Sequence, residues 1–124
     1  MKTSELIGPA LDWAVCVAEG NKPVINPVRF GGVSYGMFES ELGYAIKRYC
    51  TWDQGGPIIE RECIATYASG ACSVAPKNPD YWVAEILGTE GMITQYGPTP
   101  LIAAMRCYVA SKLGDEIEIP ERLK

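Results

Sequence analysis

The segment that decides the fold reads GPTPLIAAMRCYVASKLG, residues 97–114. Thr99 is a typical N-cap, and Pro100 is a favourable first residue of a helix, because the amide hydrogen that proline lacks would have no partner there. Apolar residues then recur at helical spacing, and Gly114 is a typical stop. The sequence therefore predicts a helix that begins at Pro100, ends before Gly114 and needs a layer to pack against.

A second helix is predicted over Thr3–Glu19, where apolar residues recur every three or four positions. A residue of the Thr3-Ser4 pair can cap it. Pro9 either kinks this helix or marks its true first turn after Gly8. The pair Gly20-Asn21 is a stop signal that ends the helix.

Strands are predicted between and after these helices. Side chains alternate over Tyr81–Leu87 and, less regularly, over Tyr44–Tyr49, and Cys63–Tyr67 also reads as a strand. Prolines and glycines interrupt Asn21–Ser40, which predicts a loop with one or two short strands. Isoleucines alternate with glutamates around Ile117–Ile119, which predicts a short edge strand or a docked tail.

The length of 124 residues suffices for one hydrophobic core but not comfortably for two, so we expect a single domain over residues 1–124. The order of elements predicts an α+β fold, with two helices packed on one face of a small, mostly antiparallel sheet. The sequence contains neither a Gly-x-Gly-x-x-Gly loop nor a Walker-type loop. Their absence disfavours a doubly wound nucleotide-binding fold.

Charge and hydropathy exclude several classes of partner. The 11 basic residues are scattered among 15 acidic ones, and the net charge is −4, so we expect no direct nucleic-acid binding. No apolar run approaches the roughly 20 residues that span a bilayer, and the N-terminus lacks the pattern of a signal peptide. We therefore expect a cytoplasmic protein without a membrane partner.

Cysteine and histidine usage limits the chemistry. The five cysteines form an odd set without a Cys-x-x-Cys pair, which fits neither a disulfide framework nor a zinc site. We interpret most of them as reduced, half-buried small side chains. The chain has no histidine, so Ser-His-Asp and Cys-His catalysis within one chain is excluded. We expect no metal and no cofactor, and a binding protein in preference to an enzyme.

The segment TWDQGGPIIERE, residues 51–62, has the composition of a binding site. Pro57 fits the first position of a short helical turn over Ile58–Glu62, although an extended strand over Pro57–Tyr67 is an alternative. In the first case two helices start alike, after Gly55-Gly56 and at Gly97–Pro100. Helix starts attract phosphate or carboxylate, so these two starts would flank an anion pocket if the fold brings them together. The alternative is that both are ordinary capped helix starts without a binding role.

Several side chains could serve such a pocket. Trp52 could stack on a planar ring, while Trp13 and Trp82 are better interpreted as core residues. Arg61 or Arg106 could neutralise a ligand charge, although Arg106 could equally form a structural ion pair with Asp53 or Glu60. The candidate ligand-binding residues are Trp52, Asp53, Gly55, Gly56, Glu60, Arg61, Thr99 and Arg106. No catalytic residue is assigned.

The motifs Trp-x-x-Gly-Gly-Pro-Ile-Ile-Glu-Arg-Glu from Trp52, Trp-x-Ala from Trp82 and Gly-Pro-Thr-Pro-Leu-Ile-Ala-Ala-Met-Arg from Gly97 resemble the NinX-like family of small phage and prophage proteins. The likeness runs from the N-terminal Lys-Thr-Ser-Glu-Leu to Pro120, with departures at Lys22–Gly43 and in the first helix. The resemblance implies a phage accessory protein in the bacterial cytoplasm, and the family has no settled activity.

Two functions follow as expectations. The first is a non-enzymatic binder of a small anionic or nucleotide-like ligand, held between Trp52–Arg61 and the start of the helix at Pro98–Pro100. The alternative is a host-protein interaction module without a small-molecule site. A histidine-free hydrolase that uses Asp53 or Glu60 is a third hypothesis and needs a pair of converging carboxylates. A homo-oligomer is compatible with each.

Overall fold

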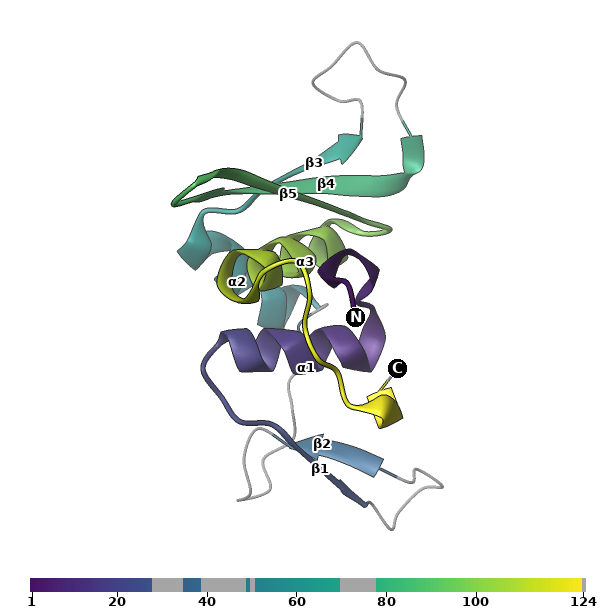
Figure 1. Ribbon diagram of the computed structural model, residues 1–124. Helices are drawn as coiled ribbons and strands as arrows, with labels where there is room; N and C mark the ends of the chain where they lie inside the picture. Colours follow the sequence, from purple (N-terminus) through teal and green to yellow (C-terminus); the bar gives the residue numbers. More distant parts are fainter. Residues whose placement is uncertain (28–34, 39–48, 50, 70–77, 124) are drawn as a thin grey trace.

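The computed structural model arranges a three-stranded sheet, a central helix and a second helix in successive layers (Figure 1). It describes residues 1–27, 35–38, 49, 51–69 and 78–123. The helices are η1 (Thr3–Glu5), α1 (Gly8–Ala18), α2 (Trp52–Glu62), α3 (Pro100–Leu113) and η2 (Glu121–Leu123). The strands are β1 (Val24–Pro27), β2 (Tyr35–Phe38), β3 (Ala65–Ser69), β4 (Asn78–Gly88) and β5 (Gly91–Gly97).

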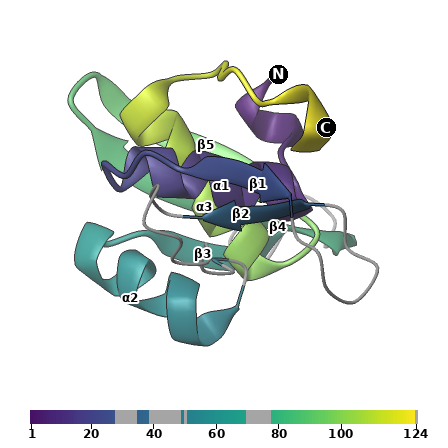
Figure 2. The ribbon, with the colours of Figure 1, turned by 90° about the horizontal axis from the view of Figure 1, so that it is seen from below.

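The three-stranded sheet is antiparallel, with strand order β3-β4-β5. Helix α3 packs on one face of it, and α1 and α2 pack on α3, so the three long helices lie on the same side of this sheet (Figure 1). The hairpin of β1 and β2 lies beyond α1, as the view from below also shows (Figure 2). The predicted α+β fold is confirmed.

Helix α3 is the centre of the core. It begins at Pro100 and ends at Leu113, as predicted, and the Thr99 hydroxyl accepts a hydrogen bond from the amide of Ile102 at 3.1 Å. Its buried residues are Leu101, Ala103, Ala104, Met105, Cys107, Tyr108, Val109 and Ala110. A helix that is buried nearly all round needs apolar neighbours on two sides, and here the sheet and α1 supply them.

The contact between α3 and β5 is close because it is made at a glycine. A Cβ atom on Gly97 would lie 2.7 Å from the amide nitrogen of Ala103. No side chain fits at that separation, so Gly97 allows the end of β5 to lie against the first turn of the helix. Trp82, paired with Gly97 in the ladder, packs against the core, as does Trp13 on α1, which confirms the core interpretation of both.

The first helix starts later than its periodicity suggests. Thr3–Glu5 forms the separate 3₁₀ turn η1, and the N-cap of α1 is Ile7, which makes no side-chain cap. The prediction that Thr3 or Ser4 caps this helix is wrong, because the fully buried Thr3 hydroxyl donates instead to the carbonyl of Gly114, at 2.7 Å. Pro9 lies in the first turn after Gly8, as the second reading of that proline predicted.

Helix α2 corrects the predicted helix start at Pro57. It runs over Trp52–Glu62, so Gly55 and Gly56 lie inside the helix and are not its N-terminal turn. A Cβ on Gly55 would overlap the carbonyl oxygen of Tyr49 and lie 2.8 Å from Cδ2 of Leu101. Close packing, and not a turn, therefore explains this glycine. The alternative of an extended strand over Pro57–Tyr67 is also wrong.

The remaining strand predictions have mixed outcomes. Strand β4 contains the predicted Tyr81–Leu87, and β1 and β2 are the short strands expected in Asn21–Ser40. Strand β3 begins at Ala65, after Cys63 ends α2 in the left-handed conformation with φ 55°. The prediction for Tyr44–Tyr49 lies outside the described residues, apart from Tyr49. The Ile117–Ile119 segment is a docked tail, tied by the amide of Ile117 to the carbonyl of Met1 at 3.0 Å.

The two neighbouring glycines of α2 give a matched test of this packing. We expect Gly55→Ala to lower the free energy of unfolding by about 1–3 kcal/mol, because the added methyl group meets the backbone of Tyr49. Gly56→Ala should raise it by up to about 1 kcal/mol, because its Cβ would meet only Trp52, at 4.0 Å, and alanine favours the helix. Urea unfolding followed by circular dichroism measures both, and equal effects would contradict the packing role of Gly55.

Candidate functional site

A cavity of about 300 Å³ opens where the end of α1 faces α2. It is lined by Glu19, Asn21, Tyr49, Asp53, Gln54, Pro57, Ile58 and Arg61. Two of the predicted site residues, Asp53 and Arg61, line this cavity. Ile58 and Tyr49, both buried, and Pro57 form its apolar wall, while the other five side chains offer hydrogen-bond donors and acceptors.

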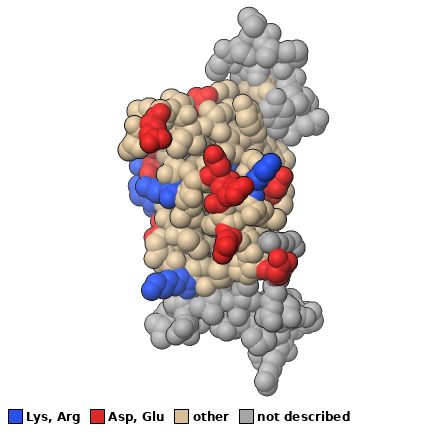
Figure 3. Space-filling model, in the orientation of Figure 1, with Lys and Arg blue, Asp and Glu red and all other residues tan. Residues whose placement is uncertain are grey.

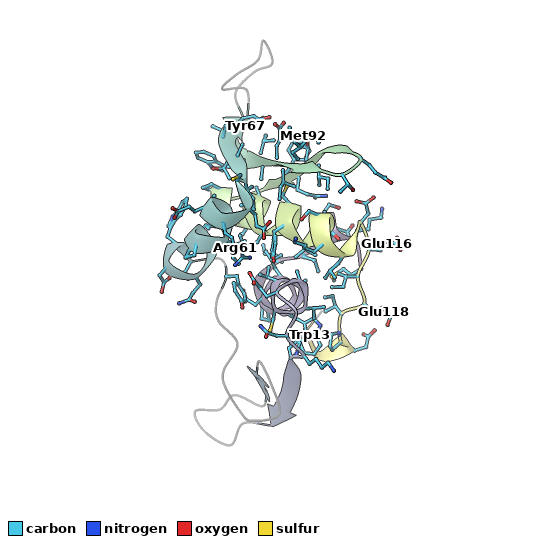
Figure 4. The ribbon with its side chains drawn as sticks, turned by 90° about the vertical axis from the view of Figure 1, so that its left-hand side faces the viewer. Trp13, Arg61, Tyr67, Met92, Glu116 and Glu118 are labelled. Carbon is cyan, nitrogen blue, oxygen red and sulfur yellow. The ribbon has the colours of Figure 1, made fainter. Side chains whose placement is uncertain are left out.

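Arg61 is the cation of the cavity, and it is already paired. Its Nη2 donates to Oε1 of Glu19 at 2.7 Å and to the Tyr108 hydroxyl at 3.2 Å, and its Nε donates to Oε1 of Glu62 at 3.2 Å. The hydrogen bond with Glu19 raises the pKa of Arg61 further above its ordinary value. The guanidinium also lies 5.8 Å from the centre of the Tyr108 ring, so α2 is fastened to α1 and α3 through one side chain (Figure 4).

Asp53 lies in the first turn of α2, where helix starts favour negative charge. A hydrogen bond from the Thr51 side chain, followed by one from Gln54, lowers the pKa of its carboxyl. The carboxylate is therefore ionised at neutral pH and occupies the position at which an external anion would bind to this helix start.

The hydrogen-bond donors expected at the helix starts are engaged within their own helices. The amide of Gly55 donates to the carbonyl of Thr51 at 2.7 Å, and Gly56 lies one residue deeper in α2. Thr99 caps α3 with its hydroxyl. The first turns of α2 and α3 are neighbours, as the separation of Gly55 from Leu101 shows, but Leu101 fills the space between them. The roles of Gly55, Gly56 and Thr99 in binding stay predictions.

Arg106 serves a different place in the fold. Its Nε donates to the carbonyl of Leu6 at 2.7 Å, and its Nη1 donates to the carbonyl of Tyr96 at 2.8 Å. It thus joins the end of η1 to β5 and does not line the cavity beside Arg61. The sequence also allowed a structural ion pair of Arg106 with Asp53 or Glu60. The hydrogen bonds described above go to backbone carbonyls instead.

The other predicted side chains lie near the cavity but do not line it. Trp52 is the first residue of α2 and its surface is 62% exposed, so its ring is accessible to a ligand or to a protein. Glu60 is exposed on the same helix. Six lining residues were not predicted. Gln54, Pro57 and Ile58 lie within the predicted segment Trp52–Arg61, whereas Glu19, Asn21 and Tyr49 lie outside it. Glu19 lies 42 positions before Arg61, and no spacing rule connects residues so far apart.

The described cysteines form no disulfide. Cys16 and Cys107 are buried, as expected for small apolar side chains, whereas Cys63 is exposed. Cys50 and Cys72 lie outside the described residues. Burial raises the pKa of the Cys107 thiol to about 12, with a smaller contribution from the nearby Glu85 carboxylate. Over the part of the chain that the structure describes, no cluster of histidine, cysteine or carboxylate side chains could hold a metal ion.

Basic and acidic side chains are interspersed on the face shown in Figure 3. This face offers no extended basic surface, and the expectation of no direct nucleic-acid binding stays a prediction. None of the helices in the described ranges is long and apolar enough to cross a membrane.

A family model described as Bacteriophage P22, NinX matches residues 2–112, which is most of the chain. A comparison with curated proteins finds no match.

The two arginines should contribute differently to stability. We expect Arg106→Ala to lower the free energy of unfolding by about 2–3 kcal/mol, because it removes two charged hydrogen bonds that join η1 to β5. Arg61→Ala should cost about 1 kcal/mol or less, since the Arg61 side chain is 50% exposed. Chemical unfolding at constant salt compares the two variants, and a larger loss for Arg61→Ala would refute this assignment.

Cys107 should make stability depend on pH in the alkaline range. The folded thiol stays protonated up to about pH 12, whereas an unfolded thiol ionises near its ordinary pKa of 9.0. The unfolded chain therefore binds fewer protons above pH 9, and stability should fall as the pH rises from about 9 to about 12. Urea unfolding of the wild type and of Cys107→Ala measures the difference in slope.

Tyr108 remains in both proteins of this comparison. Burial also raises the pKa of its hydroxyl, so its alkaline effect has the same sign and cancels in the difference. Parallel stability curves for the two proteins would show that Cys107 does not titrate as described.

Proposed function

Because this chain belongs to the NinX family of Bacteriophage P22, we propose that it is a non-enzymatic phage accessory protein that binds a small nucleotide-like ligand in the host cytoplasm. The cavity beside Arg61 is the site. Its volume of about 300 Å³ is at the lower end of the range for ligand pockets and is sufficient for a nucleobase or a nucleoside.

The charge of the lining refines the ligand that we propose. Two carboxylates, those of Glu19 and Asp53, line the cavity together with one guanidinium, that of Arg61, which is already paired with Glu19. A compact anion such as free phosphate would meet net negative charge there. A nucleotide-like ligand fits better if its base enters first, because the amino and imino hydrogens of a base can donate to the Asp53 carboxylate.

Arg61 can still contribute to binding at the mouth of the cavity. Its three described side-chain hydrogen bonds use Nε and Nη2, which leaves Nη1 to approach a ribose or phosphate oxygen. Trp52, exposed at the start of α2, could stack on the part of the ligand that remains outside. The polar cavity formed by Asp53 and Arg61 is the observation that carries this proposal.

Binding is preferred to catalysis because of the state of the carboxylates. A general acid near neutral pH requires a carboxyl group whose pKa is raised, and that of Asp53 is lowered. Glu19 is held by Arg61 at 2.7 Å, so its oxygen is already neutralised by a cation. The hydrolase hypothesis therefore has no support from the described part of this site.

Host-protein binding is the second candidate, and a separate surface favours it. Leu87 and Met92 lie opposite each other in the ladder, on the face of the sheet away from α3, and are 77% and 59% exposed. Tyr96, 53% exposed, lies four residues further along β5 on the same face. Figure 4 shows Met92 and Tyr67 at this outer side. Exposed apolar side chains that adjoin one another are typical of protein-binding surfaces.

Calorimetric titration with nucleosides, nucleoside mono-, di- and triphosphates and cyclic nucleotides tests the proposed ligand. We expect saturable heat from at least one nucleoside-containing compound. Asp53→Asn should weaken its binding by about 10- to 100-fold, because it removes a charged acceptor while asparagine keeps the size of the side chain.

Glu60→Gln is the matched control, since Glu60 is exposed on the same helix but does not line the cavity. It should bind as the wild type does. No heat from any compound, or the same loss in both variants, would contradict the proposed site. Free inorganic phosphate should give no saturable heat.

A further inference from the structure

Strand β5 has an edge without the usual protection. It is the last strand in the described sheet, and its seven residues, GMITQYG, include no charge and no proline. Its register with β4 is regular from Gly88 and Gly91 to Trp82 and Gly97. By contrast, the register of β3 at the opposite edge shifts between Ala68 and Ser69. Edges that must stay unpaired are normally guarded by charges, prolines or bulges, and β5 has none.

The direction of the peptide groups on β5 follows from its hairpin. Residues 89–90 form a two-residue turn, so Gly88 and Gly91 flank it and the peptide groups of every second residue point away from β4. These are the groups of Met92, Thr94 and Tyr96. The bond from Arg106 to the Tyr96 carbonyl, at 2.8 Å, agrees with this direction.

Arg106 also limits how far another strand can extend along this edge. Its guanidinium covers the carbonyl of Tyr96. No described residue bonds to the outward peptide groups of Met92 or Thr94. The part of the edge that can accept a new strand is therefore short and centred on Ile93.

We propose that a second copy of this chain pairs with this edge, β5 against β5, in antiparallel orientation around a two-fold axis at Ile93. Met92 of each copy then lies opposite Thr94 of the other, and each exchanges amide and carbonyl hydrogen bonds with its counterpart. The pairing joins the two three-stranded sheets into one continuous sheet. It leaves Arg106 on Tyr96 and does not involve the proposed ligand cavity.

Charge complementarity favours a second copy over an unrelated strand. In this register Glu90 of one copy lies opposite Tyr96 of the other, where the guanidinium of Arg106 is located. Because of the two-fold axis, Glu90 of each copy comes close to Arg106 of the other. They offset part of the repulsion between two chains of net charge −4. The uncharged strand itself adds no like charges at the axis.

Sedimentation equilibrium over a range of concentrations tests the pairing, and the wild type should approach twice the mass of 13.5 kDa. Thr94→Pro removes an outward amide hydrogen from each copy without removing a bond between β5 and β4. We expect it to weaken dimerisation by at least about 30-fold. Thr94→Val, which keeps that amide, should dimerise as the wild type does. Circular dichroism confirms that each variant is folded.

Two further variants separate the edge from the face. Met92→Lys places a charge at the edge and should also give a monomer. Leu87→Lys lies on the same outer face but on the central strand β4, and should remain a dimer. Hydrogen exchange should slow at the amides of Met92 and Thr94 as the concentration rises.

A wild type that stays monomeric at millimolar concentration would overturn the proposal. So would a dimer that Leu87→Lys dissociates while Thr94→Pro does not, because association would then use the face. A monomer that captures a foreign extended peptide at β5 would also overturn it, since the occupant would not be a second copy.

Discussion

The structure depends on the burial of α3 between two layers. The sheet lies against one side of this helix and α1 against the other, so its sequence must be apolar nearly all round, and eight of its residues are buried. Alanines at 103, 104 and 110 keep the helix narrow, while Leu101 and Met105 are large buried side chains in its N-terminal half. Gly97 then sets how closely the sheet can approach. Replacing any of these small residues would move a whole layer, which is costly in a core of this density.

Arg106 and Arg61 both join these layers, but they differ in burial and in the kind of partner that they bind. Arg106 is partly buried and bonds to backbone carbonyls, so its charge is used to join η1 to β5. Arg61 is half exposed and bonds to side chains of α1 and α3, which keeps α2 at the rim of the core. Helix α2 meets the core through Gly55, Ile58 and Ile59, and the cavity opens beside Arg61, where polar side chains of α1 and α2 face each other.

The fold was largely predictable from the sequence, because its elements carry local signals. Thr99, Pro100 and Gly114 delimit α3, and alternation identifies β4. The prediction failed where tertiary contacts decide. Gly-Gly-Pro in residues 55–57 has the composition of a turn, but the packing of Gly55 on Leu101 requires a glycine inside a helix. Thr3 is a residue type that often caps helices, but its hydroxyl donates a hydrogen bond to the carbonyl of Gly114 instead. The site was only partly predictable: Asp53 and Arg61 are close in sequence, whereas Glu19 and Tyr49 reach the cavity through the fold.

The bond from Thr3 to Gly114 also constrains the order of folding. It joins residues 111 positions apart, and the bond from Arg106 to Leu6 spans 100. Contacts of such sequence separation form late, because the chain entropy of a long loop must be lost before they add stability. During synthesis, α1 emerges from the ribosome long before α3, its packing partner. Until α3 follows, the apolar stripe of α1 has no packing partner and stays exposed to water, which favours aggregation of the newly made chain.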